Sequence, residues 1–159
     1  MSPAPSIETY HAHCHCGRVQ FTATLSDIRS SKVVRCNCSI CTRNGYLLVY
    51  PKRQDVVFSS GEDELSAYRF GNRKKPHKFC RVCGTSILID FSEADREDER
   101  EVTAVNIRTF VGIEDLMGEL HFQDVDGKHK LGPPYNISDL LGTEGWILDD
   151  VMMFVRASM

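Results

Sequence analysis

The chain has 159 residues, a length typical of one domain, with 42% hydrophobic and 26% charged residues. Its formal net charge of −3 excludes a strongly basic protein that nucleic acid or an anionic membrane would attract as a whole. No stretch approaches the roughly 20 apolar residues of a membrane-spanning helix, and residues 1–10 lack the basic start and apolar run of a secretory signal. We therefore expect a protein of the cytosol or the nucleus, with no membrane partner.

Short β-favouring stretches, separated by glycine and polar turns, recur through most of the chain. Apolar and polar residues alternate most clearly at residues 19–25, as in a half-buried strand. The predicted strands are residues 19–25, 46–50, 55–59, 65–70, 86–91 and 102–110. Many short strands of this kind predict an all-β, β-rich domain of antiparallel sheets.

The segments between and after these strands carry weaker signals. Residues 92–101 are acidic with interspersed arginines and predict a solvated loop or a short exposed helix, and residues 113–120 predict a short helix. The apolar C-terminal tail is expected to be partly helical and to pack on the domain or on a second subunit, which makes a homo-oligomer one expectation. We accordingly divide the chain into a flexible N-terminus (1–9), one domain (10–132) and a C-terminal extension (133–159).

Seven cysteines dominate the chemistry of the chain. An odd number cannot all pair within one chain, and clustered thiols in a reducing compartment more often bind a metal than form disulfides. Zinc is held tetrahedrally by four protein ligands in structural sites and usually by three in catalytic sites. The cysteines form three groups, Cys14-His15-Cys16, Cys36-Asn37-Cys38-Ser39-Ile40-Cys41 and Cys80-Arg81-Val82-Cys83.

The first and last groups can form one closed site. The two-residue spacer between Cys80 and Cys83, followed by Gly84, permits the tight turn of a zinc knuckle. Cys14 and Cys16, two residues apart on an extended strand, project from the same face. We therefore predict a four-thiolate zinc site of these four cysteines. A thioredoxin-like redox role for the C-x-x-C pair is the weaker interpretation, because no βαβ pattern surrounds it.

The middle group places Cys36, Cys38 and Cys41 within six residues. Three thiolates fill three corners of a tetrahedron and leave the fourth open to water or substrate, which is the arrangement of a catalytic zinc. The same spacing equally suits a second structural site that a distant histidine completes. The spacing leaves both interpretations open.

Histidines and a basic loop supply the remaining candidate groups. His11, His13 and His15 fall on the strand face opposite the cysteines and are expected at the surface rather than as ligands. His77, close in sequence to the last cysteine pair, is a weaker candidate for a fourth ligand. The basic loop at residues 73–78 is expected to be a solvated face. Its alternatives are a clamp for an anionic substrate such as a peptide carboxylate and, last, a nucleic-acid patch.

With the cysteines in this order, the sequence resembles the glutathione-dependent formaldehyde-activating enzyme family, which includes centromere protein V. The resemblance extends over about residues 10 to 125 and depends on three cysteine groups in register. The matching segments are Cys14-His15-Cys16-Gly17 with Val19 and Phe21, Cys36-Asn37-Cys38-Ser39-Ile40-Cys41, the Gly61 turn with Tyr68 and Phe70, Phe79-Cys80-Arg81-Val82-Cys83-Gly84-Thr85, and Val105-Asn106-Ile107-Arg108.

The resemblance implies the family's tent-like, Mss4-like fold of antiparallel sheets and two zinc ions per chain. It implies a carbon–sulfur lyase that acts on the thiol adduct of a small aldehyde, since the family's reaction joins glutathione to formaldehyde. The ligand assignments that it implies are Cys14, Cys16, Cys80 and Cys83 for a structural zinc, and Cys36, Cys38 and Cys41 for a catalytic zinc at the active site.

This chemistry suits a three-thiolate centre. Metal coordination deprotonates a thiol, and the thiolate can add to an aldehyde carbon. Three cysteinate ligands give zinc a net negative charge, which makes it a poor generator of hydroxide, so thiol transfer fits better than hydrolysis. No His or Glu is adjacent to the middle group as a general acid, whereas Arg43, Asn44 and Tyr46 follow closely and are candidates to orient a substrate.

Two other functional classes compete with the enzyme. One is a non-catalytic, zinc-stabilised protein-binding or nucleic-acid-binding module, which would hold its partner with the 73–78 loop and the apolar tail. The weaker one is a metal-buffering or redox-sensing protein, which would release zinc reversibly on mild oxidation.

Overall fold

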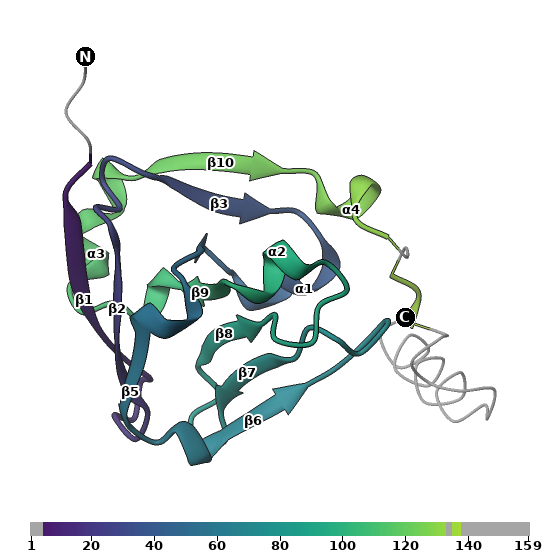
Figure 1. The fold of residues 1–159 in the computed structure, drawn as a ribbon, viewed down its shortest axis with the longest axis horizontal. Coiled ribbons are helices and arrows are strands. Elements are labelled where there is room, and N and C mark those ends of the chain that lie inside the picture. Colours follow the sequence, from purple (N-terminus) through teal and green to yellow (C-terminus); the bar gives the residue numbers. More distant parts are fainter. Residues whose placement is uncertain (1–4, 133–134, 138–159) are drawn as a thin grey trace, which may run out of the picture.

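The structure is a computed structural model that describes residues 5–132 and 135–137. It confirms the predicted β-rich fold, with ten strands in the described residues and only short helices (Figure 1). None of the helices in these residues has the length and apolar character needed to cross a bilayer. Most of the C-terminal extension lies outside the described residues, so its packing and the domain division at residues 9 and 132 stay predictions.

The smaller sheet has three antiparallel strands in the order β1-β2-β5. Its strands are β1 (Ile7–His13), β2 (Gln20–Ser26) and β5 (Val56–Ser60). The alternation predicted for residues 19–25 is present, because Phe21 and Ala23 are buried while Gln20 is exposed. β1 was anticipated only through the extended chain assumed around the early histidines and cysteines, because Ala12 is its one buried residue and its apolar alternation is weak.

The larger sheet has seven strands in the order β10-β3-β4-β9-β8-β7-β6. Its pairs are antiparallel except for β10 with β3, which run side by side in the same direction along the top of Figure 1. In chain order its strands are β3 (Lys32–Cys36), β4 (Leu48–Val49), β6 (Leu65–Tyr68), β7 (His77–Cys80), β8 (Ser86–Asp90), β9 (Thr103–Asn106) and β10 (His121–Val125).

Short helical turns join the strands. The α-helices are α1 (Ser39–Asn44), α2 (Glu97–Arg100), α3 (Ile113–Leu116) and α4 (Gly127–Lys130). The 3₁₀ turns are η1 (Arg53–Asp55), η2 (Glu62–Glu64), η3 (Ile107–Thr109) and η4 (Met117–Glu119). The stretch 92–101, predicted as a solvated loop or a short exposed helix, contains α2, and the short helix predicted at residues 113–120 corresponds to α3 with η4. The predicted strand 102–110 ends early, because the Asn106 side chain accepts the Arg108 N–H and starts η3.

Two hydrophobic clusters hold the elements together. The larger one spans both sheets and contains the fully buried Phe21, Ile28, Ile87 and Ile107. The smaller one contains five buried residues, Cys41, Tyr46, Leu48, Ile89 and Ala104. Burial of such side chains contributes about 1.5–3 kcal/mol each. The smaller cluster matters for function because Cys36 and Cys38 pack against it.

Candidate metal centres and the cleft beside them

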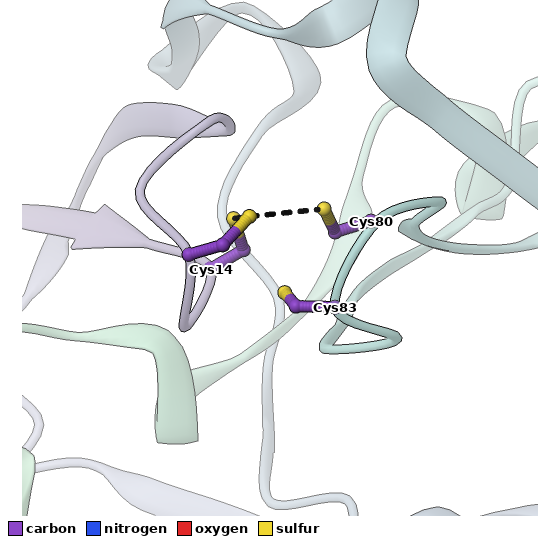
Figure 2. A group of neighbouring side chains, drawn as sticks. Cys14, Cys80 and Cys83 are labelled. Atoms are coloured by element: carbon purple, nitrogen blue, oxygen red, sulfur yellow. Dashed lines mark hydrogen bonds between the residues drawn. The ribbon is translucent and has the colours of Figure 1, made fainter.

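The first cysteine cluster joins two turns that lie far apart in the sequence. Cys14 and Cys16 come from the turn after β1, whereas Cys80 ends β7 and Cys83 lies in the turn that follows. The four sulfur atoms lie within 4.8 Å of one another. Figure 2 shows the labelled side chains of Cys14, Cys80 and Cys83 pointing toward one another.

The two turns have the same local geometry. The Gly17 N–H donates to the Cys14 carbonyl at 3.0 Å, and the Gly84 N–H donates to the Cys80 carbonyl at 2.8 Å. Both glycines have a φ of +76°, a left-handed conformation that costs a residue with a Cβ about 1–2 kcal/mol. The predicted knuckle at Gly84 is therefore present, but Cys14 and Cys16 meet through a second knuckle rather than along an extended strand.

The spacing of these sulfur atoms suits a tetrahedral metal site. Sulfur ligands at 2.3 Å from a zinc ion in a regular tetrahedron lie about 3.8 Å from one another. The Cys14 and Cys16 Sγ atoms are 3.5 Å apart, and the Cys16 and Cys80 Sγ atoms are 3.8 Å apart. Cys14 and Cys80 are fully buried. Four sulfurs at these distances fill a tetrahedron and leave no position for a substrate.

The second cluster comes from a single stretch of the chain. Cys36 ends β3, Cys38 is the N-cap of α1, and Cys41 lies within α1. Their sulfur atoms also lie within 4.8 Å of one another, and no further His, Cys, Asp or Glu of the described residues joins the group. Three sulfurs fit three corners of a tetrahedral site and leave the fourth corner without a protein ligand from this part of the chain.

Hydrogen bonds within the second cluster favour negative charge on one sulfur. A hydrogen bond from the Cys41 thiol lowers the pKa of Cys38 to about 5, and the same contact raises the pKa of Cys41. Backbone N–H groups at the start of α1 add to the effect on Cys38, as is usual for thiols at helix N-termini. Burial raises the pKa of the Cys36 thiol. These shifts favour the thiolate, the form that ligates a metal, at Cys38 and the protonated thiol at Cys36 and Cys41.

A cleft of about 550 Å³ opens beside the second cluster. This volume lies within the range of small-molecule sites. The lining includes Cys36 and Cys41 of the cluster, the loop after α1, and polar side chains of three other segments. Its residues are Arg35, Cys36, Asn37, Cys41, Thr42, Gly45, Tyr46, Leu47, Arg108, Asp124, Val125 and Asp126.

The turn from β10 into α4 lies directly against Cys36. The Asn37 amide donates to Asp126 Oδ1 at 2.9 Å, and its oxygen accepts the Lys128 N–H at 2.9 Å. A Cβ built on Gly127 would lie 2.4 Å from Cys36 Sγ, so only glycine fits there without displacement. Hydrogen bonds from Asn37 and His129 lower the pKa of Asp126, which is therefore ionised at neutral pH.

The histidines lie outside both clusters. His11, His13 and His15 are exposed, in agreement with their predicted place at the surface. His77 is buried, its Nδ1 lies 3.2 Å from the Tyr46 hydroxyl, and it belongs to neither group of neighbouring sulfurs. Burial lowers the pKa of His77 to about 4, so this side chain is neutral and serves the packing around Tyr46.

Acidic residues pair with two lysines of the basic loop and with an arginine close to it. Lys74 pairs with Asp95, and Lys75 pairs with Glu99 at 2.9 Å. Beyond this loop, Arg69 forms a bidentate contact with Glu93. The acidic stretch at residues 92–101 therefore packs its charges against these cations. This pairing disfavours both the anion clamp and the nucleic-acid patch.

Of the three candidates for substrate orientation, Tyr46 alone lines the cleft. Arg43 and Asn44 instead line a separate, smaller pocket of about 200 Å³ with Tyr68 and Phe70, which removes them from the candidates. Three contributions were not predicted. Asp126 and the Arg108 side chain line the cleft, and Gly127 lies against Cys36 of the cluster. They come from segments with no chemical motif of their own, although residues 105–108 belong to the family resemblance.

The chain is similar to known proteins both in sequence and in structure. Residues 9–121 match the family described as glutathione-dependent formaldehyde-activating enzyme. A crystal structure of a Rhodobacter sphaeroides protein is similar at 29% sequence identity and a TM-score of 0.59, over 71% of this chain and 99% of that chain. No curated protein matches the sequence.

Proposed function

Because the chain belongs to the glutathione-dependent formaldehyde-activating enzyme family, we propose that it is a zinc-dependent carbon–sulfur lyase for adducts of a glutathione-type thiol with a small aldehyde. One observation carries the proposal. Three neighbouring cysteine sulfurs lie beside a cleft, and no fourth ligand from the described residues completes their site. A purely structural centre needs four protein ligands and no adjoining cleft.

The proposal divides the cysteines by role. Cys14, Cys16, Cys80 and Cys83 hold a structural zinc, because their spacing satisfies a complete tetrahedron. Cys36, Cys38 and Cys41 hold a catalytic zinc, which gives two ions per chain. When bound there, zinc supplies an acceptor for a thiol sulfur and lowers the pKa of that thiol.

The reaction is an addition to a carbonyl group. The thiol gives up its proton, its sulfur lone pair forms a bond to the aldehyde carbon, and the carbonyl π electrons move to the oxygen, which takes up a proton. The reverse direction breaks the same carbon–sulfur bond. Asp126 is ionised and cannot supply that proton at neutral pH. Its carboxylate, fixed by Asn37, instead gives one part of the cleft a negative charge.

The test is the exchange rate between formaldehyde plus glutathione and their hydroxymethyl adduct, followed by two-dimensional exchange NMR. We expect the zinc-loaded protein to accelerate this exchange and Cys38→Ser to abolish the acceleration. The variant should keep its fold and one zinc per chain, measured by circular dichroism and elemental analysis. A two-zinc wild-type protein that leaves the rate unchanged contradicts the function. Global unfolding of Cys38→Ser contradicts the division of roles.

A further inference from the structure

Two arginines line the cleft beside the second cluster, and their charges are compensated differently. Arg35 forms two hydrogen bonds with the Asp124 carboxylate, at 2.7 and 3.1 Å, and lies over the Phe122 ring. Arg108 forms no ion pair with any carboxylate of the described residues; its Nε donates to the Gly45 carbonyl at 2.5 Å. Of the two arginines that line the cleft, Arg108 is therefore the one that forms no ion pair with a carboxylate of the described residues.

The surrounding backbone holds Arg108 in place. Its neighbours in η3, Ile107 and Thr109, are buried, and its own N–H donates to the buried Asn106 side chain at 3.3 Å. Gly45 ends α1, where its N–H binds the Cys41 carbonyl. The Gly45 contact therefore couples the guanidinium to the helix that carries one of the cluster's sulfurs.

The remaining donors of Arg108 suit a carboxylate. With Nε engaged by Gly45, the two terminal nitrogens have no hydrogen-bond partner among the described residues. A guanidinium presents such donors in a planar fork that matches the two oxygens of a carboxylate. The acids that line the same cleft are already engaged, Asp124 by Arg35 and Asp126 by Asn37.

We propose that Arg108 binds a carboxylate of the thiol substrate, so that the cleft selects thiols that carry this group. The inference rests on the proposed function, because it concerns the same cleft and the same thiol. It adds a specificity residue from a segment more than 60 positions beyond the cysteines of the cluster. The sulfur would be held at the cysteine cluster and the carboxylate at Arg108.

The test compares glutathione with its dimethyl ester, which keeps the thiol and lacks both carboxylates. Dissociation constants are measured by calorimetry on the zinc-loaded protein without aldehyde, so the readout does not depend on turnover. We expect the wild-type protein to prefer glutathione and Arg108→Met to bind it about tenfold to a hundredfold more weakly, as for a lost charge-assisted hydrogen bond. Binding of the ester should not change, and Arg108→Lys should recover part of the preference.

Arg43→Met is the matched control, since Arg43 lies on the same helix as Cys41 but lines the smaller pocket. It makes the same change in charge and should bind both thiols as the wild-type protein does. A preference for glutathione that survives in Arg108→Met, or that is absent from the wild-type protein, overturns the inference alone. Failure of the wild-type protein to bind either thiol overturns the proposed function as well.

Discussion

The two cysteine clusters use the same ligand atom in opposite ways. The first joins two turns separated by more than 60 residues, and its knuckles each fix a pair of sulfurs. The second takes three sulfurs from six consecutive residues and lies beside a cleft. Distant ligands make a metal part of the tertiary structure, whereas adjacent ligands leave the fold independent of it. The proposed division of the cysteines between a structural and a catalytic zinc follows from this difference.

The largest effect is expected from a ligand of the first cluster. In Cys80→Ser the fully buried sulfur is lost, and the turn after β7 is no longer tied to the turn after β1. Zinc binding at such sites contributes about 10–16 kcal/mol to folding, against a total stability of about 5–15 kcal/mol for a domain. We expect the variant to be unfolded or to melt far below the wild-type protein in thermal denaturation. If Cys80→Ser melted at the wild-type temperature, as Cys38→Ser is expected to, the first cluster would contribute no more to stability than the second.

A smaller loss of stability is expected from substitution of Gly61, which packs against Arg18, directly after the Cys14–Gly17 knuckle. Its φ is +74°, and a Cβ there would lie 2.2 Å from the Arg18 carbonyl oxygen. Gly61→Ala therefore combines left-handed strain of about 1–2 kcal/mol with overpacking of about 1–3 kcal/mol. We expect the free energy of unfolding to fall by about 2–5 kcal/mol in urea titration.

Gly71→Ala separates these two causes. Gly71 has a φ of +58°, but nothing lies within 4 Å of the position that a Cβ would take there. This variant should lose only the strain energy of about 1–2 kcal/mol. Equal losses in Gly61→Ala and Gly71→Ala would show that the contact with Arg18 contributes nothing to stability.

The contrast between the clusters also explains which features could be predicted from the sequence. The cysteine groups, the Gly84 knuckle and most strands follow from local spacing and composition, which act within a few residues. The family resemblance favoured the open, catalytic interpretation of the middle group, which its spacing had left undecided. Gly127 and the Arg108 side chain belong to the second site only because β10 pairs with β3 and η3 follows β9. Such placement depends on tertiary pairing, for which isolated residues give no local signal.

The smallest effect on stability, and the most selective, is expected at Gly127. Alanine favours a helix over glycine by about 1 kcal/mol, so propensity alone predicts that Gly127→Ala stabilises α4. The new Cβ would nevertheless lie 2.4 Å from Cys36 Sγ and 3.1 Å from the Cys38 Cβ. The sulfur of Cys36 or the turn must move, which distorts the second cluster and leaves the first intact. We expect a nearly unchanged melting temperature and a zinc affinity about fivefold to 150-fold weaker at the second site, as overpacking of about 1–3 kcal/mol implies.

Gly118→Ala is the control for this substitution, because Gly118 also lies in a short helical turn and nothing lies within 4 Å of its Cβ position. It should retain both zinc ions in competition with a chromogenic chelator, whereas Gly127→Ala should release one ion early and one late. Early release of a single ion would show that the backbone at Gly127 determines the zinc affinity of the second cluster. Retention of both ions by Gly127→Ala would mean that the β10–α4 turn moves without cost and does not position Cys36.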